Sequence, residues 1–202
     1  MLSEPTMDKP IIILLLGTSG VGKTTVLEYL QNHYMFEVSK KFTTRVPRNT
    51  PSDKRDFIFC RTTDEFPKDN ILFFQSYGAA FGIQVDQIQS SVTRGRSHVL
   101  TVGDSETVRL LKRYFPNLVK TILLYCEYDI LKSRITSSLD TNRAKRWNII
   151  NKEIQNIYSW LGDVDYILDC SMPFEDTKVK VDELIKRIRL NLRLKEKFED
   201  AT

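Results

Sequence analysis

The chain has 202 residues, of which 41% are hydrophobic and 28% are charged, and its formal net charge at pH 7 is +4. These values are typical of a soluble globular protein with one sizeable core and room for a small inserted subdomain. The mildly basic charge suits an anionic substrate but is too weak to indicate a nucleic-acid-binding protein. Three cysteines without CxxC spacing predict free thiols, so a disulfide scaffold or zinc site is not expected. We expect a cytoplasmic protein, because the apolar run at 11–16 is too short for a signal peptide or a membrane span.

The first predicted element is a strand that leads into a glycine-rich motif. The apolar run 11–16 is typical of a buried parallel strand, and residues 26–30 have the pattern of an amphipathic helix. Between them, every fixed position of the phosphate-binding pattern G-x-x-x-x-G-K-[ST] is filled by the segment Gly17-Thr18-Ser19-Gly20-Val21-Gly22-Lys23-Thr24. A glycine-rich turn with a chance lysine is the alternative. The flanking strand and helix favour the phosphate-binding loop.

This motif predicts a nucleoside triphosphate site, with ATP and Mg²⁺ as cofactors. Glycines let successive backbone N–H groups point at a phosphate, and the helix N-terminus adds its dipole. Lys23 supplies a cation, and the Thr24 hydroxyl can bind the magnesium ion. Thr25 follows in the same helical turn and completes the predicted cofactor-binding segment.

Further along the chain, predicted strands and helices alternate. Strands are expected at 56–60, 71–74, 98–102, 121–126 and 166–170, and helices at 86–93, 106–114, 129–135, 143–161 and 176–198. Residues 78–82, which begin and end in glycine, predict a turn. The alternation indicates an α/β fold with a doubly wound parallel sheet that binds ligands at the carboxyl ends of its strands. Several short strands between about 44 and 82 interrupt it and predict a small inserted antiparallel lobe.

A second set of motifs resembles the guanylate kinase family. The segments are Thr43-Thr44-Arg45-Val46-Pro47-Arg48, then Asp56-Phe57-Ile58-Phe59, then Phe81-Gly82. That family has a phosphate loop followed by T-T-R-x-P-R, D-Y-x-F and Y-G in the same order, and the resemblance covers nearly the whole chain. It implies a P-loop NTPase fold and ATP-dependent phosphoryl transfer to a small phosphate-bearing acceptor. By the same resemblance, Arg45 and Arg48 would bind the acceptor phosphate through paired hydrogen bonds. Arginines on a solvated loop are the alternative.

The resemblance also implies a lid and a division of the chain. Arg134, Arg143 and Arg146 would lie on a helical lid, at about 134–147, that closes over the triphosphate and excludes water. Alternatively, these arginines lie on a solvated helix face. The core of this single domain would comprise 10–43 and 83–202, with the acceptor-binding lobe at about 44–82.

The departures from the family concern the acceptor. The two tyrosines that would hydrogen-bond the acceptor phosphate correspond to Phe57 and Phe81, and the groups that would read guanine correspond to Leu72 and Ile83. The serine that precedes T-T-R in the family falls near Lys41. The acidic pair of the family becomes 101–103, which leaves Asp104 as the nearest candidate to replace it. Apolar side chains cannot pair with the edge of guanine, and each base group left unpaired would cost about 1–3 kcal/mol.

The sequence therefore predicts a kinase with an intact donor site and altered base recognition. A nucleoside monophosphate is the expected acceptor, and guanine specificity is doubtful. A sugar phosphate kinase of the ribose 1,5-bisphosphate type is one alternative. The other is a non-catalytic guanylate kinase-like binding module, although the intact phosphate loop argues against it. No nucleic-acid or membrane partner is expected, the basic C-terminal helix indicates a solvated face, and the sequence does not predict an oligomeric state.

Overall fold

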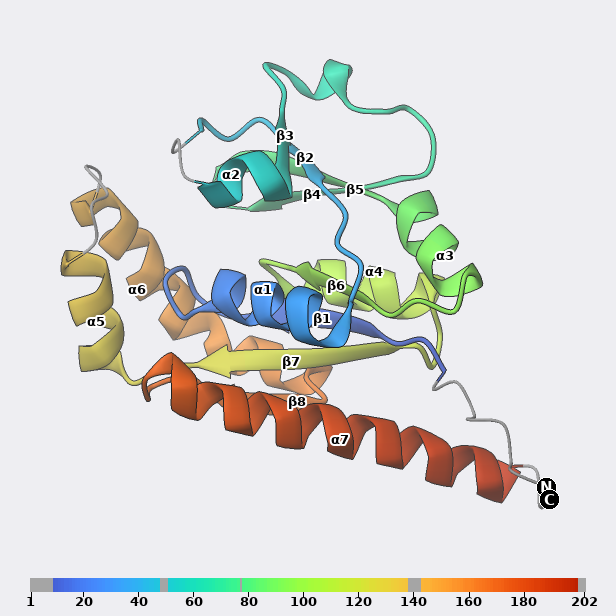
Figure 1. Cartoon of the computed structure of the whole chain (residues 1–202). Helices are drawn as coiled ribbons and strands as arrows, with labels where there is room; N and C mark the ends of the chain where they lie inside the picture. Colours follow the sequence, from blue (N-terminus) through green and yellow to red (C-terminus); the bar gives the residue numbers. More distant parts are fainter. Residues whose placement is uncertain (1–8, 48–50, 77, 138–142, 200–202) are drawn as a thin grey trace.

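A parallel sheet forms the centre of the molecule in the computed structural model, which describes residues 9–47, 51–76, 78–137 and 143–199 (Figure 1). Its strand order is β6-β1-β7-β8, and all neighbouring pairs are parallel. The bounds are β1 Ile12–Leu16, β6 His98–Thr101, β7 Val119–Tyr125 and β8 Tyr166–Asp169. Every residue of β1 is buried, as its uninterrupted apolar sequence predicts for a central strand.

Helices cover both faces of this sheet, because β1 sends alternate side chains to opposite sides. Ile13 and Leu15 pack with α1 and α7, whereas Leu14 and Leu16 pack with α3 and α4. The helices are α1 Lys23–Tyr34, α3 Val85–Thr93, α4 Ser105–Tyr114, α5 Tyr128–Thr136, α6 Arg143–Trp160 and α7 Phe174–Glu199. The expected doubly wound α/β architecture is confirmed.

A second sheet lies above the carboxyl end of β6 and forms the inserted lobe (Figure 1). Its strand order is β3-β2-β5-β4. The bounds are β2 Lys41–Thr43, β3 Phe57–Phe59, β4 Ile71–Ser76 and β5 Ala79–Gln84, with the short helices α2 Pro51–Asp56 and η1 Thr63–Glu65 beside them. The pairs β2–β5 and β4–β5 are antiparallel, but β2–β3 is parallel, so this sheet is mixed. It begins before residue 44 and ends after residue 82, because β2 and β5 both belong to it.

The prediction of a turn at residues 78–82 is wrong. Only Gly78 lies in the turn, with φ +73°, and Ala79–Gln84 forms strand β5 along the whole length of β4. Gly82 is inside this strand because packing requires it there. A Cβ atom at Gly82 would lie 2.5 Å from Cδ1 of Ile71 and 3.0 Å from the ring of Phe66. Gly82 thus permits a close approach across the strand pair.

The second sheet turns one face toward the parallel sheet, and we call this its inner face. Residues paired across neighbouring strands share a face, which puts a series of positions together: Lys41, Thr43, Phe57, Phe59, Leu72, Phe74, Phe81 and Ile83. Leu72 and Ile83 join the hydrophobic cluster that contains Leu16 and Leu100. This packing fixes the lobe over the edge of the parallel sheet at which the phosphate loop begins.

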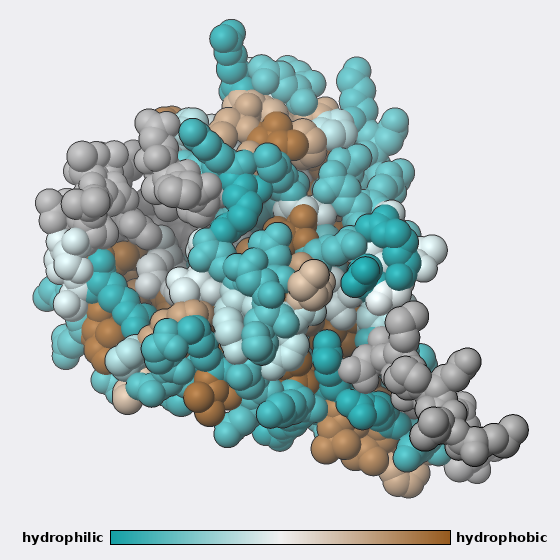
Figure 2. Space-filling model, in the orientation of Figure 1, coloured by the Kyte–Doolittle hydropathy of each residue, from teal (hydrophilic) through white to brown (hydrophobic). Residues whose placement is uncertain are grey.

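Most residues on the face shown in Figure 2 are hydrophilic. Exposed apolar side chains on α7 include Val179 near its start and Leu190, Leu194 and Phe198 toward its end. In the part of the chain that the structure describes, no helix is long and apolar enough to span a bilayer.

Candidate active site

The predicted phosphate loop follows the carboxyl end of β1 and leads directly into α1. Three of its glycines have positive φ: Gly17 at +151°, Gly20 at +87° and Gly22 at +113°. L-residues with a Cβ rarely adopt these conformations. At Gly17 the space is also restricted, since a Cβ atom there would lie 2.7 Å from the carbonyl oxygen of Leu124 on β7. The glycines of the motif are therefore required by this backbone path.

Lys23 stands at the first position of α1 and folds back over the loop. Its Nζ donates hydrogen bonds to the carbonyl oxygens of Gly17, at 2.5 Å, and Thr18, at 2.8 Å. No acidic residue lies in the first turn of α1. Positive charge and helix N-terminal N–H groups therefore gather at one point, as an anion-binding loop requires.

Two helices from the predicted lid region contact this loop. Arg134 on α5 donates to the carbonyl oxygen of Val21 at 3.5 Å, and to that of Cys170 at 2.8 Å. Glu153 on α6 accepts a hydrogen bond from the backbone N–H of Ser19 at 3.3 Å. Sequence reasoning missed Glu153, which has no recognisable motif of its own. Arg143 and Arg146 belong to the first turns of α6, and their side chains lie outside the described part of the structure.

Arg45 lies on the lobe, directly after β2. Its Nη2 donates to Oδ1 of Asp53 at 2.6 Å, and Asp53 is only 4% exposed. The guanidinium carbon lies 4.9 Å from the centre of the Phe57 ring and 5.4 Å from that of Phe59. This ion pair and the two rings hold the guanidinium group in position. Arg48, its predicted companion, lies outside the described residues.

The positions expected to read guanine lie next to each other on the inner face. Leu72 and Ile83 are directly paired across β4 and β5, and both are buried. The rings of Phe74 and Phe81 stack beside them with centroids 5.3 Å apart, and the Phe57 centroid lies 6.2 Å from that of Phe81. The inner face is therefore an apolar, largely aromatic surface.

Lys41 contributes a charged group to this surface, and the sequence indicates it only as a departure from the family. Its Nζ donates to the carbonyl oxygen of Thr101 at 2.7 Å and to Oγ1 of Thr101 at 2.6 Å. Burial lowers the pKa of Lys41 to about 7, and the positive charges of Lys23 and Arg45 act in the same direction. The carboxylate of Asp56 opposes this shift. These interactions bring Lys41 into the same electrostatic environment as Lys23 and Arg45.

Asp104, the candidate for the missing acidic pair, caps α4. Its Oδ1 accepts from the backbone N–H of Thr107 at 2.7 Å, and its Oδ2 accepts from the hydroxyl of Thr107 at 2.9 Å. Both carboxylate oxygens thus satisfy groups at a helix N-terminus, which is a frequent role for aspartate. The helix cap alone explains why an aspartate stands at position 104.

No cluster of three or more metal-binding side chains (His, Cys, Asp or Glu) occurs within the described ranges. The three cysteines are free thiols, as expected, and Cys126 and Cys170 are buried. Burial raises the pKa of Cys170 to about 12. Burial thus disfavours the thiolate, the nucleophilic form, at Cys126 and Cys170.

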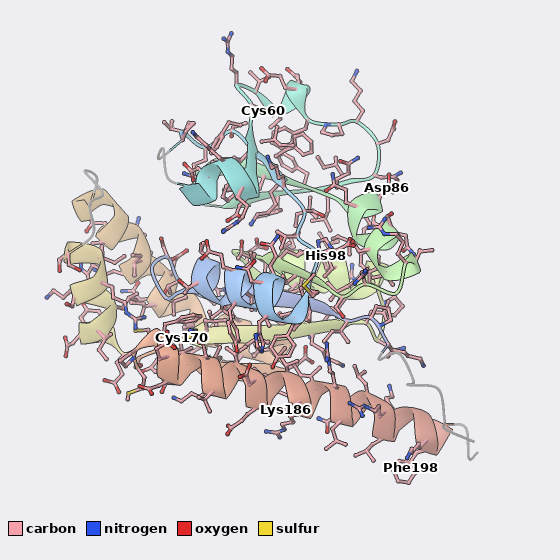
Figure 3. The ribbon with its side chains drawn as sticks, in the orientation of Figure 1. Cys60, Asp86, His98, Cys170, Lys186 and Phe198 are labelled. Atoms are coloured by element: carbon pink, nitrogen blue, oxygen red, sulfur yellow. The ribbon has the colours of Figure 1, made fainter. Side chains whose placement is uncertain are left out.

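A separate cavity of ≈ 360 Å³ lies between α3 and the segment that precedes β2. Glu37, Asp86, Ser91 and His98 are among the residues that line it, and no residue of the phosphate loop takes part. Figure 3 labels two of the lining residues, His98 and Asp86. The cavity is thus distinct from the nucleotide site.

A glycine-rich phosphate loop at the edge of a parallel sheet, with an arginine-bearing lobe above it, defines an α/β kinase of the P-loop class. The chain is 33% identical over 171 residues to a guanylate kinase of Onion yellows phytoplasma (strain OY-M), with 79% of this chain and 78% of that protein covered. It is 31% identical over 171 residues to the guanylate kinase of Aster yellows witches'-broom phytoplasma (strain AYWB), with the same shares covered, 79% and 78%. The chain therefore belongs to the guanylate kinase family. No protein-family model matches it.

Solved structures agree with this fold. The guanylate kinase from Anaplasma phagocytophilum superposes with a TM-score of 0.65 at 17% identity, covering 90% of this chain and 87% of that one. A gluconokinase from Sinorhizobium meliloti 1021 gives a TM-score of 0.57 at 15% identity, covering 93% and 98%. At these identities the likeness concerns the fold alone.

Proposed function

We propose that this protein transfers the γ-phosphoryl group of ATP to a small phosphate-bearing acceptor, with a nucleoside monophosphate as the leading class. The observation that carries the proposal is the phosphate loop with Lys23 and positive-φ glycines, above which the lobe presents Arg45. Phosphoryl transfer needs positioning and positive charge more than a protein nucleophile. No general base has to be assigned, because a phosphate acceptor is already anionic.

On the donor side, backbone N–H groups of the loop would hold the phosphates of ATP, and Lys23 would turn from Gly17 and Thr18 toward them. The Thr24 hydroxyl, in the first turn of α1, would bind Mg²⁺. That turn carries no carboxylate, and Mg²⁺ commonly keeps water and substrate phosphate oxygens as its other ligands. The residues present fit such an ion, which would neutralise charge on the transferred group when bound. Arg134, together with Arg143 and Arg146, would close the site over the phosphates.

On the acceptor side, Arg45 with Arg48 would bind the phosphate, and the aromatic inner face would contact the remainder of the acceptor. Stacking on phenylalanine rings tolerates any base, because every base has a π-face. We therefore infer that the acceptor is selected by its phosphate and its fit to an apolar surface, with weak or absent guanine readout.

One experiment tests this function. The purified protein with Mg-ATP is offered every nucleoside monophosphate and a panel of sugar phosphates, and ADP formation and phosphorylated product are measured together. Transfer to one or more nucleoside monophosphates is the expected result. Exclusive transfer to a sugar phosphate would favour the ribose 1,5-bisphosphate type of kinase. No product with any acceptor, together with binding of a phosphopeptide, would favour a non-catalytic module.

A further inference from the structure

Lys41 is a buried lysine that the proposed function leaves without a task. It lies on β2, on the inner face of the second sheet, and is 8% exposed. Its two hydrogen bonds to Thr101 reach across to the last residue of β6. The side chain therefore extends from the lobe to the carboxyl edge of the parallel sheet, where ligands of such folds bind.

Lys41 is influenced by two cations of the site: one is assigned to the phosphates of ATP and the other to the phosphate of the acceptor. The charge of Lys23, from the phosphate loop, and that of Arg45, from the lobe, both act on its ammonium group. Its Nζ lies 5.1 Å from the centre of the Phe57 ring, and the guanidinium of Arg45 lies 4.9 Å from the same ring centre. Lys41 and Arg45 thus share one aromatic neighbour, at the position where the family has a tyrosine hydroxyl.

The hydrogen bonds of Lys41 leave one donor for a ligand. A protonated ammonium group has three N–H donors, and Thr101 accepts two of them. Within the described part of the chain, no other acceptor lies within hydrogen-bond distance of Lys41. The nearby Asp56 carboxylate is bound by Arg55 through its Nε at 2.6 Å and its Nη2 at 2.9 Å. A buried cation beside other cations is unfavourable unless an anion joins it.

We propose that Lys41 binds the anionic group of the acceptor together with Arg45 and is a specificity-determining residue for doubly charged acceptors. This inference rests on the proposed function. Phe57 and Phe81 lack the hydroxyl donors that the family uses at the acceptor phosphate, and Lys41 supplies a charged donor beside Phe57. A purely structural link between the lobe and β6 is the competing explanation.

The proposal has a pH signature that a structural link would lack. Below about pH 7 Lys41 is protonated and attracts the anion, whereas above this value it is a neutral amine. An anion bound beside Nζ stabilises the ammonium form, so binding near neutral pH takes up a proton. The other charged groups that face Lys41 are Asp56, Lys23 and Arg45.

The test uses sulfate, which stays doubly charged over the whole range from pH 6 to 8.5. The phosphate loop is first saturated with Mg²⁺ and a non-hydrolysable ATP analogue, so that sulfate cannot bind there. Sulfate is then titrated by calorimetry in buffers of different ionisation enthalpy, which reports affinity and proton uptake together. Lys41→Met removes the charge, and Lys41→Arg keeps it at every pH used. Lys40→Met is the matched control, because Lys40 is the exposed neighbour of Lys41 in the chain.

We expect sulfate affinity at pH 6 to fall about tenfold to a hundredfold in Lys41→Met and to stay unchanged in Lys40→Met. The unmodified protein should lose affinity between pH 6 and 8.5, while Lys41→Arg should not. The wild-type pH profile and proton uptake test the proposal even where a variant folds poorly. Equal sulfate binding by wild type and Lys41→Met, or no sulfate binding at all, would overturn it. Failure of the proposed function is distinguishable, because it would abolish transfer to every acceptor without changing this sulfate measurement.

Discussion

Leu72 on β4 lies directly opposite Ile83 on β5, and the two side chains are 5% and 1% exposed. Both belong to the hydrophobic cluster that joins the lobe to the parallel sheet. A polar base edge placed against this pair would lose its hydrogen bonds to water and gain none in return. The same two side chains therefore stabilise the packing of the lobe and disfavour an acceptor whose polar base edge would lie against them.

GMP should be a poor acceptor for the unmodified protein, and kcat/KM for GMP should not exceed that for other nucleoside monophosphates. The double variant Leu72→Glu with Ile83→Ser should raise the relative use of GMP, because it supplies an acceptor and a hydroxyl for the guanine edge. The measurement is kcat/KM with four nucleoside monophosphates before and after the change. Because both positions are buried, thermal melting must show that the variant folds. Efficient guanine-selective turnover by the wild type would mean that other residues read the base.

Lys23→Ala should lower phosphoryl transfer by about a hundredfold or more, because it removes the cation at the β and γ phosphates. The melting temperature should change little, because the hydrogen bonds that Lys23 donates to Gly17 and Thr18 lie within its own loop. Turnover is followed as ADP release with saturating acceptor. The control is Lys132→Ala on α5, an exposed lysine of the lid region. Full ATP-dependent activity in Lys23→Ala would exclude the loop from the reaction.

Arg45→Ala should weaken acceptor binding by about 1.5–3 kcal/mol and leave KM for ATP near its wild-type value. Lysine should rescue poorly, because an ammonium group cannot reproduce the two aligned donors of the guanidinium group. The variant also removes the ion pair between Arg45 and the buried Asp53, so stability has to be measured beside kinetics. Arg61→Ala, at an exposed position of the same lobe, serves as the control. An equal rise in the KM for ATP and the KM for the acceptor would contradict a role of Arg45 at the acceptor alone.

The sequence correctly predicted the elements whose structure depends on residues close together in the chain. The buried strand 12–16 and the loop after it follow from an uninterrupted apolar run and from glycines at fixed spacing. The failure at 78–82 has a physical reason, because Gly82 serves close packing with Ile71 inside a strand, and a single sequence does not separate this use of glycine from a turn.

Contacts between distant segments were beyond local reasoning. Lys41 and Thr101 are 60 residues apart, and nothing near either residue indicates that β2 crosses the end of β6. Glu153 reaches the phosphate loop across 134 residues and carries no motif. Asp104 was predicted only as the nearest candidate to replace the family's acidic pair, and the structure shows that both its oxygens bind Thr107. The roles assigned to the arginines stay predictions until they are measured.

The protein should lose stability in mild acid because of His98. This ring is 1% exposed, and burial lowers its pKa to about 4, although Glu37 opposes the shift. The unfolded chain takes up a proton on this histidine near pH 6.5, whereas the folded chain does so only near pH 4. The stability that the buried neutral ring of His98 contributes is therefore fully present above pH 6.5. As the pH falls toward 4 this contribution is lost, and the free energy of unfolding decreases by about 3 kcal/mol in total.

His98→Gln should remove this acid-dependent loss, because glutamine does not titrate but can still hydrogen-bond Ser39 and Ser91, the present partners of the ring at 3.2 and 3.1 Å. Denaturant unfolding at pH 7, 6, 5 and 4.5 gives the free energy of unfolding for both proteins. His33→Gln, at an exposed position on α1, should keep the wild-type slope. The Glu37 carboxyl also titrates in acid, but hydrogen bonding from Ser91 and the charge of Arg94 lower its pKa, so its effect falls below this window. If His98→Gln and wild type lose stability equally between pH 6.5 and 4.5, the acid sensitivity arises elsewhere.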